Sequence, residues 1–172
     1  MKTIYKTVMA MIAATTLLTS CSDDSDGNTG GNTPSGTYIS AKVGGSTFET
    51  LSQQGFNAAS ATKQVIGDDT FITITATSGN TNTMVITLMG ITATGTYDVG
   101  PTSGNAVAFF DTATETAFAS SADCAGAEGE LKVTHYSAEK IEGTFTFTGK
   151  SDDDCSQSKT VTQGKFRGIY AN

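Results

Sequence analysis

The sequence contains no tryptophan and only one histidine, two prolines and three cysteines among its 172 residues. The single histidine, His135, provides too few imidazole groups for the common zinc sites, which combine several His and Cys ligands. The sequence also lacks a Gly-x-Ser-x-Gly elbow, a His-Glu-x-x-His motif and a phosphate-binding glycine loop. These absences argue against nucleophilic triads and zinc-dependent hydrolysis.

Basic residues are scarce, because 10 Lys and Arg stand against 17 Asp and Glu, which gives a formal net charge of −7. Nucleic acids and anionic lipid headgroups are bound through clustered Lys and Arg side chains. Only Lys159, Lys165 and Arg167 fall close together, at a spacing that suits the solvent side of a strand. We therefore expect no nucleic-acid partner.

No apolar run is long enough for a retained transmembrane helix. The run Val8–Leu18 covers about 11 residues, whereas a membrane-spanning helix needs about 20. It follows Lys2 and Lys6, and this layout predicts a cleaved signal peptide over residues 1–20. Leu18-Thr19-Ser20-Cys21 resembles the bacterial lipobox, in which the cysteine is acylated and becomes the first residue. The alternative is an ordinary signal peptide in which Cys21 has no role.

Lipidation of Cys21 would anchor the protein to a membrane, because each buried methylene contributes about 0.8 kcal/mol and several acyl chains hold almost permanently. After the cysteine, residues 21–36 are polar, Gly-rich and acidic, which predicts a flexible tether. Ser22–Asp26 resembles the surface-export signal of Bacteroidota lipoproteins, and the alternative is a solvated acidic linker. We expect an outer-membrane lipoprotein, with the periplasmic and the cell-surface side both open.

Cys124 and Cys155 are the two cysteines that the folded part would retain. In an oxidising compartment two cysteines can pair in only one way. A bridge would close a loop of about 30 residues and contribute on the order of 3 kcal/mol in the chain-entropy model. The alternative is a pair of free thiols.

Residues 37–172 are predicted to form one all-β domain, because short alternating runs rich in Thr, Val, Ile and Phe recur along them. In Ile141–Thr148 apolar and Thr side chains alternate with a period of two, as in an antiparallel sheet with one face on a core. Gly44-Gly45 and Ser78–Asn82 suit hairpin turns. The predicted strands are Tyr38–Val43, Ser46–Thr50, Phe71–Thr77, Thr83–Met89, Gly95–Val99, Ala106–Asp111, Glu130–Tyr136, Ile141–Thr148 and Thr160–Tyr170.

This strand pattern predicts an antiparallel β-sandwich of about 8–10 short strands, with a β-barrel as the alternative. The segment Phe56–Gly67 fits either a strand with a bulge or a loop. Because Trp is absent and many apolar positions are Ala, Met or Thr, the core is expected to be thin, and a disulfide would compensate for that.

Three motifs carry a family resemblance. Ala41–Phe48 reads Ala-Lys-Val-Gly-Gly-x-x-Phe, Gly143–Thr148 reads Gly-Thr-Phe-x-Phe-Thr, and Val161–Phe166 has a Gly before an apolar-ended run. With the tether, these motifs resemble a group of Bacteroidota lipoproteins known only as domains of unknown function. The resemblance implies glycines at turns and close approaches and phenylalanines in the core, and it implies no catalytic residue.

Carboxylates are the remaining acid–base candidates, since glycoside hydrolysis needs only two of them at a set separation. His135 is in phase with Leu131 and Val133, which favours a structural role. We therefore predict no catalytic residue and a protein that is not an enzyme, with a carboxylate-dependent hydrolase of glycans or peptides as the alternative. The acids concerned lie among Thr, Ser and Gly, which favours solvated charges: Glu115, Glu128, Glu130, Glu139 and Glu142.

Two acidic loops are candidate calcium sites, because calcium takes 6–8 oxygen ligands. One is Gly67-Asp68-Asp69 and the other is Asp152-Asp153-Asp154, beside Cys155. The alternative is that these charges keep the sheet ends soluble. We expect no cofactor, with calcium at Asp152, Asp153 and Asp154 as the candidate exception.

The expected function is that of a membrane-anchored module for binding or envelope assembly, with a glycan or protein partner that the sequence does not identify. Loops at the end of a sandwich commonly bind ligands. With no Trp, stacking on sugars would fall to tyrosines that also suit a sheet margin: Tyr38, Tyr97, Tyr136 and Tyr170. Phe109 and Phe110 are adjacent on one predicted strand, so one ring should face outward and could contact a partner.

Overall fold

The computed structural model describes residues 35–53, 56–151 and 155–170. Within these ranges the chain forms strands and turns, without helix, so the predicted all-β fold is confirmed. No helix long and apolar enough to cross a bilayer occurs in these ranges. The strands are β1 (Tyr38–Val43), β2 (Ser46–Glu49), β3 (Ser52–Gln53), β4 (Phe56–Asn57), β5 (Ala59–Ile66), β6 (Asp69–Thr77), β7 (Thr83–Met89), β8 (Gly95–Val99), β9 (Ala106–Asp111), β10 (Thr116–Ala119), β11 (Glu128–Tyr136), β12 (Lys140–Ser151) and β13 (Ser158–Ile169).

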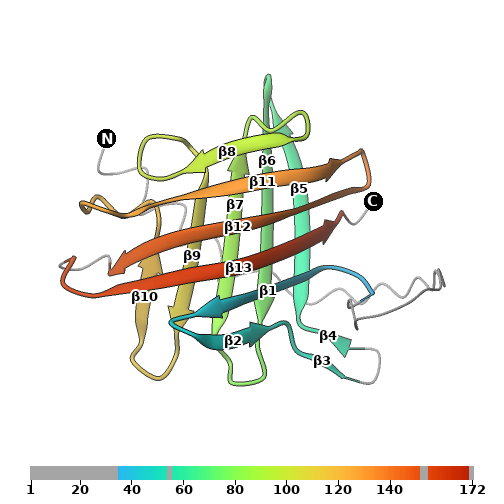
Figure 1. Ribbon diagram of the computed structural model, residues 1–172. Coiled ribbons are helices and arrows are strands. Elements are labelled where there is room, and N and C mark those ends of the chain that lie inside the picture. The colour runs from blue at the N-terminus through green and yellow to red at the C-terminus, as the bar shows by residue number, and fades with distance from the viewer. Residues whose placement is uncertain (1–34, 54–55, 152–154, 171–172) are drawn as a thin grey trace. The chain divides into compact units, whose positions relative to one another are not determined.

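Eleven of these strands form one antiparallel sheet in the order β2-β1-β13-β12-β10-β9-β7-β6-β5, with β11 paired to β12 and β8 paired to β11. Strands β3 and β4 form a separate small sheet. The front layer in Figure 1 contains β8, β11, β12, β13, β1 and β2, and its strands run across those of the rear layer, β10, β9, β7, β6 and β5. The two layers of the expected sandwich are therefore parts of a single strongly curled sheet, a half-barrel.

The joint between the layers is at the end of β12. Residues Ile141–Thr148 of this strand pair with β11, whereas Lys150 and Ser151 pair with β10. At the change of partner stands Gly149, where a Cβ atom would lie 2.8 Å from the backbone of Phe118. Only glycine permits this close approach, and the sheet can bend into its second layer there.

The core lies between the layers and follows from the alternation of side chains. Inward residues on β6 and β7 such as Ile72, Ile74 and Ile86 are fully buried, and their neighbours in the chain face outward. The front layer contributes aliphatic side chains together with phenylalanine rings, among them Phe145, Phe147 and Phe166. Because all of these residues come from strands with period-two patterns, the core could be anticipated strand by strand.

Glycine and phenylalanine alternate across β12 and β13 in a reciprocal arrangement. Gly143 is the register partner of Phe166, and Phe145 is the register partner of Gly164. A Cβ atom on Gly143 would lie 2.7 Å from the Phe166 ring, and one on Gly164 would lie 2.7 Å from the Phe145 ring. The predicted close-approach role of the glycines is therefore confirmed, since each ring lies over the glycine of the facing strand.

Several strand bounds differ from the prediction. The segment left undecided contains the short strand β4 and the longer β5, and β10 was not predicted. Together with β3, these strands raise the number within the described residues to thirteen, more than predicted. The Gly44-Gly45 hairpin turn is confirmed, with φ angles of 55° and 88°.

Candidate functional site

A groove with a volume of about 440 Å³ lies beside β2 at the edge of the front layer. One wall is the chain from Thr47 to Ser52, and the opposite wall is the start of the β6–β7 loop, Ser78–Asn80. Most of the lining side chains carry hydroxyl, amide or carboxylate groups, and Leu51 is the apolar exception. The groove therefore offers many hydrogen-bonding groups to a ligand.

The first wall of the groove has an unpaired backbone edge. The two-residue turn makes Val43 and Ser46 a hydrogen-bonded pair, and Ala41 and Phe48 form the next such pair. Thr47 and Glu49 therefore direct their backbone N–H and C=O groups away from β1. Strand β2 ends the sheet order, and on this side the described residues form an isolated bridge between Thr50, directly after β2, and Ser78, whose register sets Gly79 beside Glu49.

The opposite wall is fixed by hydrogen bonds. The Ser78 hydroxyl donates to the carbonyl of Asn82 at 3.1 Å and also contacts the side-chain oxygen of Asn80. Thr112, at the end of β9, donates through its backbone N–H and its hydroxyl to the Asn82 side-chain oxygen, at 3.1 and 2.7 Å. On the β2 side, the Thr50 hydroxyl bridges the N–H and C=O of Ile39. Both walls are thus braced before any ligand arrives.

A second hollow of about 170 Å³ adjoins the groove, and the two share Thr47 and Asn80. Its apolar lining is Val43, Phe48 and Phe109, and the two rings meet edge to face with centroids 6.2 Å apart. Both phenylalanines are buried. The hollow therefore combines an apolar floor with the polar groups that the two cavities share, which is common in ligand sites.

An ion pair stands at the border of this hollow. Lys159 on β13 lies 3.4 Å from the carboxylate of Asp111 on β9. The two strands belong to different layers, so the pair joins the front layer to the rear layer. The Lys159 ammonium also lies 5.5 Å from the centre of the Phe118 ring. Both charges are balanced within the hollow, which leaves the exposed Glu49 as the groove's remaining charge.

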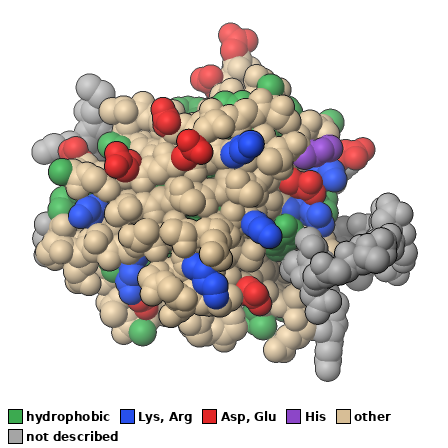
Figure 2. Space-filling view, in the orientation of Figure 1, with side chains coloured by type: hydrophobic (Ala, Val, Ile, Leu, Met, Phe, Trp, Pro, Cys, Tyr) green, Lys and Arg blue, Asp and Glu red, His purple; other side chains and the backbone are tan. Residues whose placement is uncertain are grey.

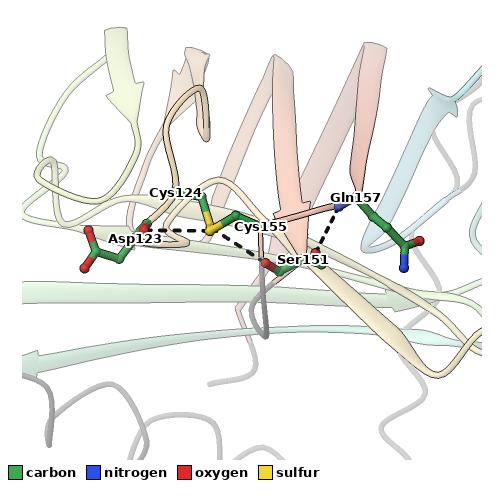
Figure 3. Close-up of a disulfide and its surroundings, with 5 residues drawn as sticks. All are labelled: Asp123, Cys124, Ser151, Cys155 and Gln157. Carbon is green, nitrogen blue, oxygen red and sulfur yellow. Dashed lines mark hydrogen bonds between the residues drawn. A yellow bond between two sulfur atoms is a disulfide. The ribbon is translucent and has the colours of Figure 1, made fainter.

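The predicted Cys124–Cys155 disulfide is present, with Cα atoms 5.6 Å apart. It joins the β10–β11 loop to the β12–β13 loop (Figure 3). The Cys124 sulfur lies 3.7 Å from the Ser151 carbonyl oxygen, and the Cys155 sulfur lies 3.9 Å from that of Asp123. Because bonded sulfurs carry no hydrogen, these are packing contacts that fit the bridge between the two loops.

Two predicted sites lie outside the described residues. These are the lipidation residue Cys21 and the calcium candidates Asp152, Asp153 and Asp154. Of the other acidic pair, Asp68 lies in the exposed β5–β6 turn and Asp69 is the exposed first residue of β6. Among the residues that are described, no group of three or more His, Cys, Asp or Glu side chains is placed to hold a metal ion. Calcium binding thus stays a prediction.

The five candidate catalytic glutamates do not meet in either cavity. Glu128 and Glu130 lie on the outward face of β11, and Glu115 and Glu139 are in exposed turns. Figure 2 shows the front layer, over which acidic and basic side chains are spread among uncharged ones. His135 is half-buried, and a register shift that follows Val133 takes it out of strict phase with the buried Leu131 and Val133.

Glu142 takes part in a small charged cluster on the outer face of β12 and β13. Arg167 donates from Nε to its carboxylate at 2.6 Å, and Lys140 lies 3.4 Å away. Burial acts to raise the pKa of Glu142, but the hydrogen bond and charge of Arg167, aided by Lys140, hold that pKa below its ordinary value. A carboxyl that is kept ionised in this way is suited to a structural ion pair rather than to proton donation.

The tyrosines considered for sugar stacking are dispersed. Tyr38 stands over Arg167, and its pKa is raised mainly by burial. Tyr136 and Tyr170 both lie near the ammonium of Lys63, at 4.6 and 5.4 Å from the ring centres. None of the four tyrosines lines the groove or the hollow. Phe110 is exposed while Phe109 is buried, so the predicted outward ring is confirmed.

The sequence did not single out Glu49 and Asn80 of the groove, or Asn82 of the adjoining hollow. Glu49 lies in the predicted strand Ser46–Thr50 and is the last residue of β2, and the two asparagines lie in a predicted hairpin loop. A hairpin loop rich in Ser, Thr and Asn was a signal for polar contacts. Its position opposite the free edge of β2 depends on the curl of the sheet, which local patterns do not encode.

A family model described as a domain of unknown function, DUF6252, matches residues 45–169. The chain belongs to the DUF6252 family. The expectation of a family of unknown function is thereby confirmed. The DUF6252 match runs from the Gly44-Gly45 turn to the end of β13 and so includes both walls of the groove. No curated protein and no solved structure matches the chain.

Proposed function

We propose that this DUF6252 protein is a lipid-anchored, extracytoplasmic binding module of the Bacteroidota type that holds a partner at the cell envelope without transforming it. The groove beside β2 is the observation that carries the binding part of the proposal. It combines a strand edge, walls fixed by hydrogen bonds and an adjoining apolar hollow. The fold that holds it is cross-linked by a disulfide. Preformed sites of this kind lower the entropy cost of binding.

The sequence supports the anchoring part of the proposal. Signal-peptide charge, a short apolar run and Leu18-Thr19-Ser20-Cys21 follow one another in the required order. A disulfide joining the two cysteines of the folded domain is consistent with an oxidising compartment and leaves Cys21 for acylation. The outer membrane is the proposed location, and the acidic run Ser22–Asp26 favours its outer side.

Detergent phase separation of intact cells tests the anchor. The wild-type protein should enter the detergent phase and carry acyl mass on its N-terminal peptide, and Cys21→Ser should do neither. Ser22→Ala is the matched control and should behave like the wild type. Unchanged partition of Cys21→Ser would refute the anchor, and protection from protease on intact cells would refute the outer-face placement.

Arrays of glycans and synthetic peptides test the binding role. Ser52→Arg places a long side chain in the groove, whereas Thr146→Arg places one on the exposed face of β12. We expect ligands that Ser52→Arg no longer binds and Thr146→Arg still binds, and mass spectrometry should recover them intact. Ligands recovered cleaved would instead favour the alternative of a carboxylate-dependent hydrolase. Equal ligand binding by Ser52→Arg and the wild type would contradict the groove as the binding site.

A further inference from the structure

The geometry points to a defined chemical class of ligand. We propose that the groove binds an extended peptide segment, which pairs with the free edge of β2 as an additional antiparallel strand. This inference rests on the proposed binding function and names its ligand. Strand addition of this kind uses backbone hydrogen bonds for affinity and alternate side-chain pockets for specificity.

The backbone of β2 is ready for such pairing. Thr47 directs its N–H and C=O toward the groove, so the residue of an antiparallel partner opposite it could form a doubly hydrogen-bonded pair. Glu49 turns its backbone groups to the same side, where the Thr50–Ser78 bridge sets Gly79 beside it. Both residues line the groove. Backbone groups that face a cavity in this way select a ligand that carries alternating donors and acceptors along its length, as a peptide main chain does.

The neighbouring chain shows the path that an added strand would take. Directly after β2, the Leu51 N–H donates to the Thr77 carbonyl at 2.9 Å, and Thr50 forms an antiparallel bridge with Ser78. At Gly79, beside Glu49, the chain turns into the β6–β7 loop, and from there toward Thr47 the edge of β2 has no pairing strand among the described residues. The groove therefore occupies the place of a strand that continues β6 alongside β2, in the antiparallel direction.

The side chains around this edge define a preferred tripeptide. Glu49 is exposed and makes no ion pair with a described residue, so a Lys or Arg whose side chain reaches its carboxylate is favoured. The next peptide residue would point inward beside Phe48, toward the hollow floored by Phe48 and Phe109, which suits Val or Ala. The third would stand opposite Thr47, where a hydroxyl side chain matches. The preferred order is basic, then small apolar, then Ser or Thr.

A glycan fits this groove less well than a peptide does. Sugar rings commonly stack on exposed aromatic faces, but the rings at the hollow, Phe48 and Phe109, are each only 3% exposed. The groove wall next to them is hydroxyl and amide in character. Glycan binding is therefore kept as an outcome of the test that would contradict the peptide assignment.

Fluorescence anisotropy with a labelled peptide Gly-Ser-Lys-Val-Thr-Ser-Gly tests the inference on the oxidised full-length mature protein. A second peptide carries N-methyl groups at alternate backbone positions and keeps every side chain, and a third has Glu in place of Lys. Thr47→Pro removes the outward N–H of β2 without removing a backbone hydrogen bond to β1, although it does remove the bond from the Lys42 ammonium to the Thr47 hydroxyl, and edge strands tolerate proline. Thr47→Ser is its matched control, and urea denaturation checks that each variant is folded.

We expect the unmodified peptide to bind the wild type and Thr47→Ser, and to bind at least tenfold more weakly after N-methylation or to Thr47→Pro. Glu49→Lys should reverse the preference, so that the Glu peptide binds better than the Lys peptide. Equal binding of the N-methylated peptide, or no binding at about millimolar concentration, would overturn the inference. If glycans bind in a manner sensitive to Ser52→Arg while no peptide does, strand addition fails but the proposed binding function stands. If no ligand responds to Ser52→Arg, both fail.

Discussion

Replacing Gly143 with alanine tests how closely the strands of the front layer approach one another. The new Cβ atom would overlap the Lys132 carbonyl oxygen on β11 and would lie 2.7 Å from the Phe166 ring on β13. A carbonyl in a paired strand cannot move alone, so the clash falls on the backbone of two strand pairs. Overpacking of a core typically costs about 1–3 kcal/mol. The smaller freedom of alanine in the unfolded chain returns about 0.4–1 kcal/mol.

The net loss should be about 1–2 kcal/mol in the free energy of unfolding. With a urea slope of about 1–3 kcal/mol/M for a small domain, the midpoint of urea unfolding should fall by roughly 1 M. Gly79→Ala is the matched control, because its Cβ would lie 3.9 Å from the nearest atom, in Leu51, and it should change stability by less than about 0.5 kcal/mol. Adding Phe166→Leu should restore only part of the loss, since the carbonyl stays in place.

Midpoints of Gly143→Ala and Gly79→Ala that agree within experimental error would refute this reasoning. They would mean that the sheet can open at Gly143 at no cost. Complete recovery in Gly143→Ala/Phe166→Leu would instead assign the clash to the ring alone. The measurement therefore separates a rigid backbone contact from an adjustable side-chain contact.

Three further changes should alter stability in defined directions. Loss of the bridge in Cys124→Ser/Cys155→Ser should lower the free energy of unfolding by on the order of 3 kcal/mol, and an unchanged urea midpoint would contradict the chain-entropy argument. Arg167 holds the pKa of Glu142 in the folded protein below its ordinary value of 4.5. The ion pair therefore stabilises the fold fully at a pH above 4.5, and this stabilisation is lost as the pH falls through the lowered pKa of the folded state. Glu142→Gln should therefore flatten the acid limb of stability measured by urea unfolding, and parallel pH curves would contradict this. The buried Tyr170 hydroxyl has no hydrogen-bond partner in the described chain, so Tyr170→Phe should keep or raise the thermal midpoint, and a clear drop would reveal a partner.

The strands that could be predicted are those whose side chains alternate strictly between core and solvent. β7 and β12 are examples, since Met84, Ile86 and Leu88, or Phe145 and Phe147, are separated by outward residues. β10 was not predicted because it has only four residues, and its last two residues are both buried instead of alternating. β5 was left undecided because Ala61 alone is buried along it. Short or one-sided strands take their structure from tertiary pairing rather than from their own pattern.

The candidate site was less predictable than the strands. The disulfide could be anticipated because only two cysteines remain in the folded part, so pairing followed from counting. The groove forms where the chain after β6 turns away from β2. Its two walls, at Ser78 and at Thr47, are far apart in the sequence and are brought together only by the fold. The sequence pointed to glutamates and tyrosines as candidate site residues. In the structure the cavities lie instead beside backbone groups and asparagines.

The disulfide also determines what a protease could remove from this molecule. Cys124 and Cys155 close a covalent ring that contains the β11–β12 hairpin, whose β12 holds both layers of the sheet together. A single cut in the exposed Ser137–Glu139 turn would break the chain and leave its two parts joined through sulfur. Such a nicked protein would migrate as one species without reductant and as two fragments with it. At a cell surface rich in proteases, the ring would allow the domain to be cut without being shed.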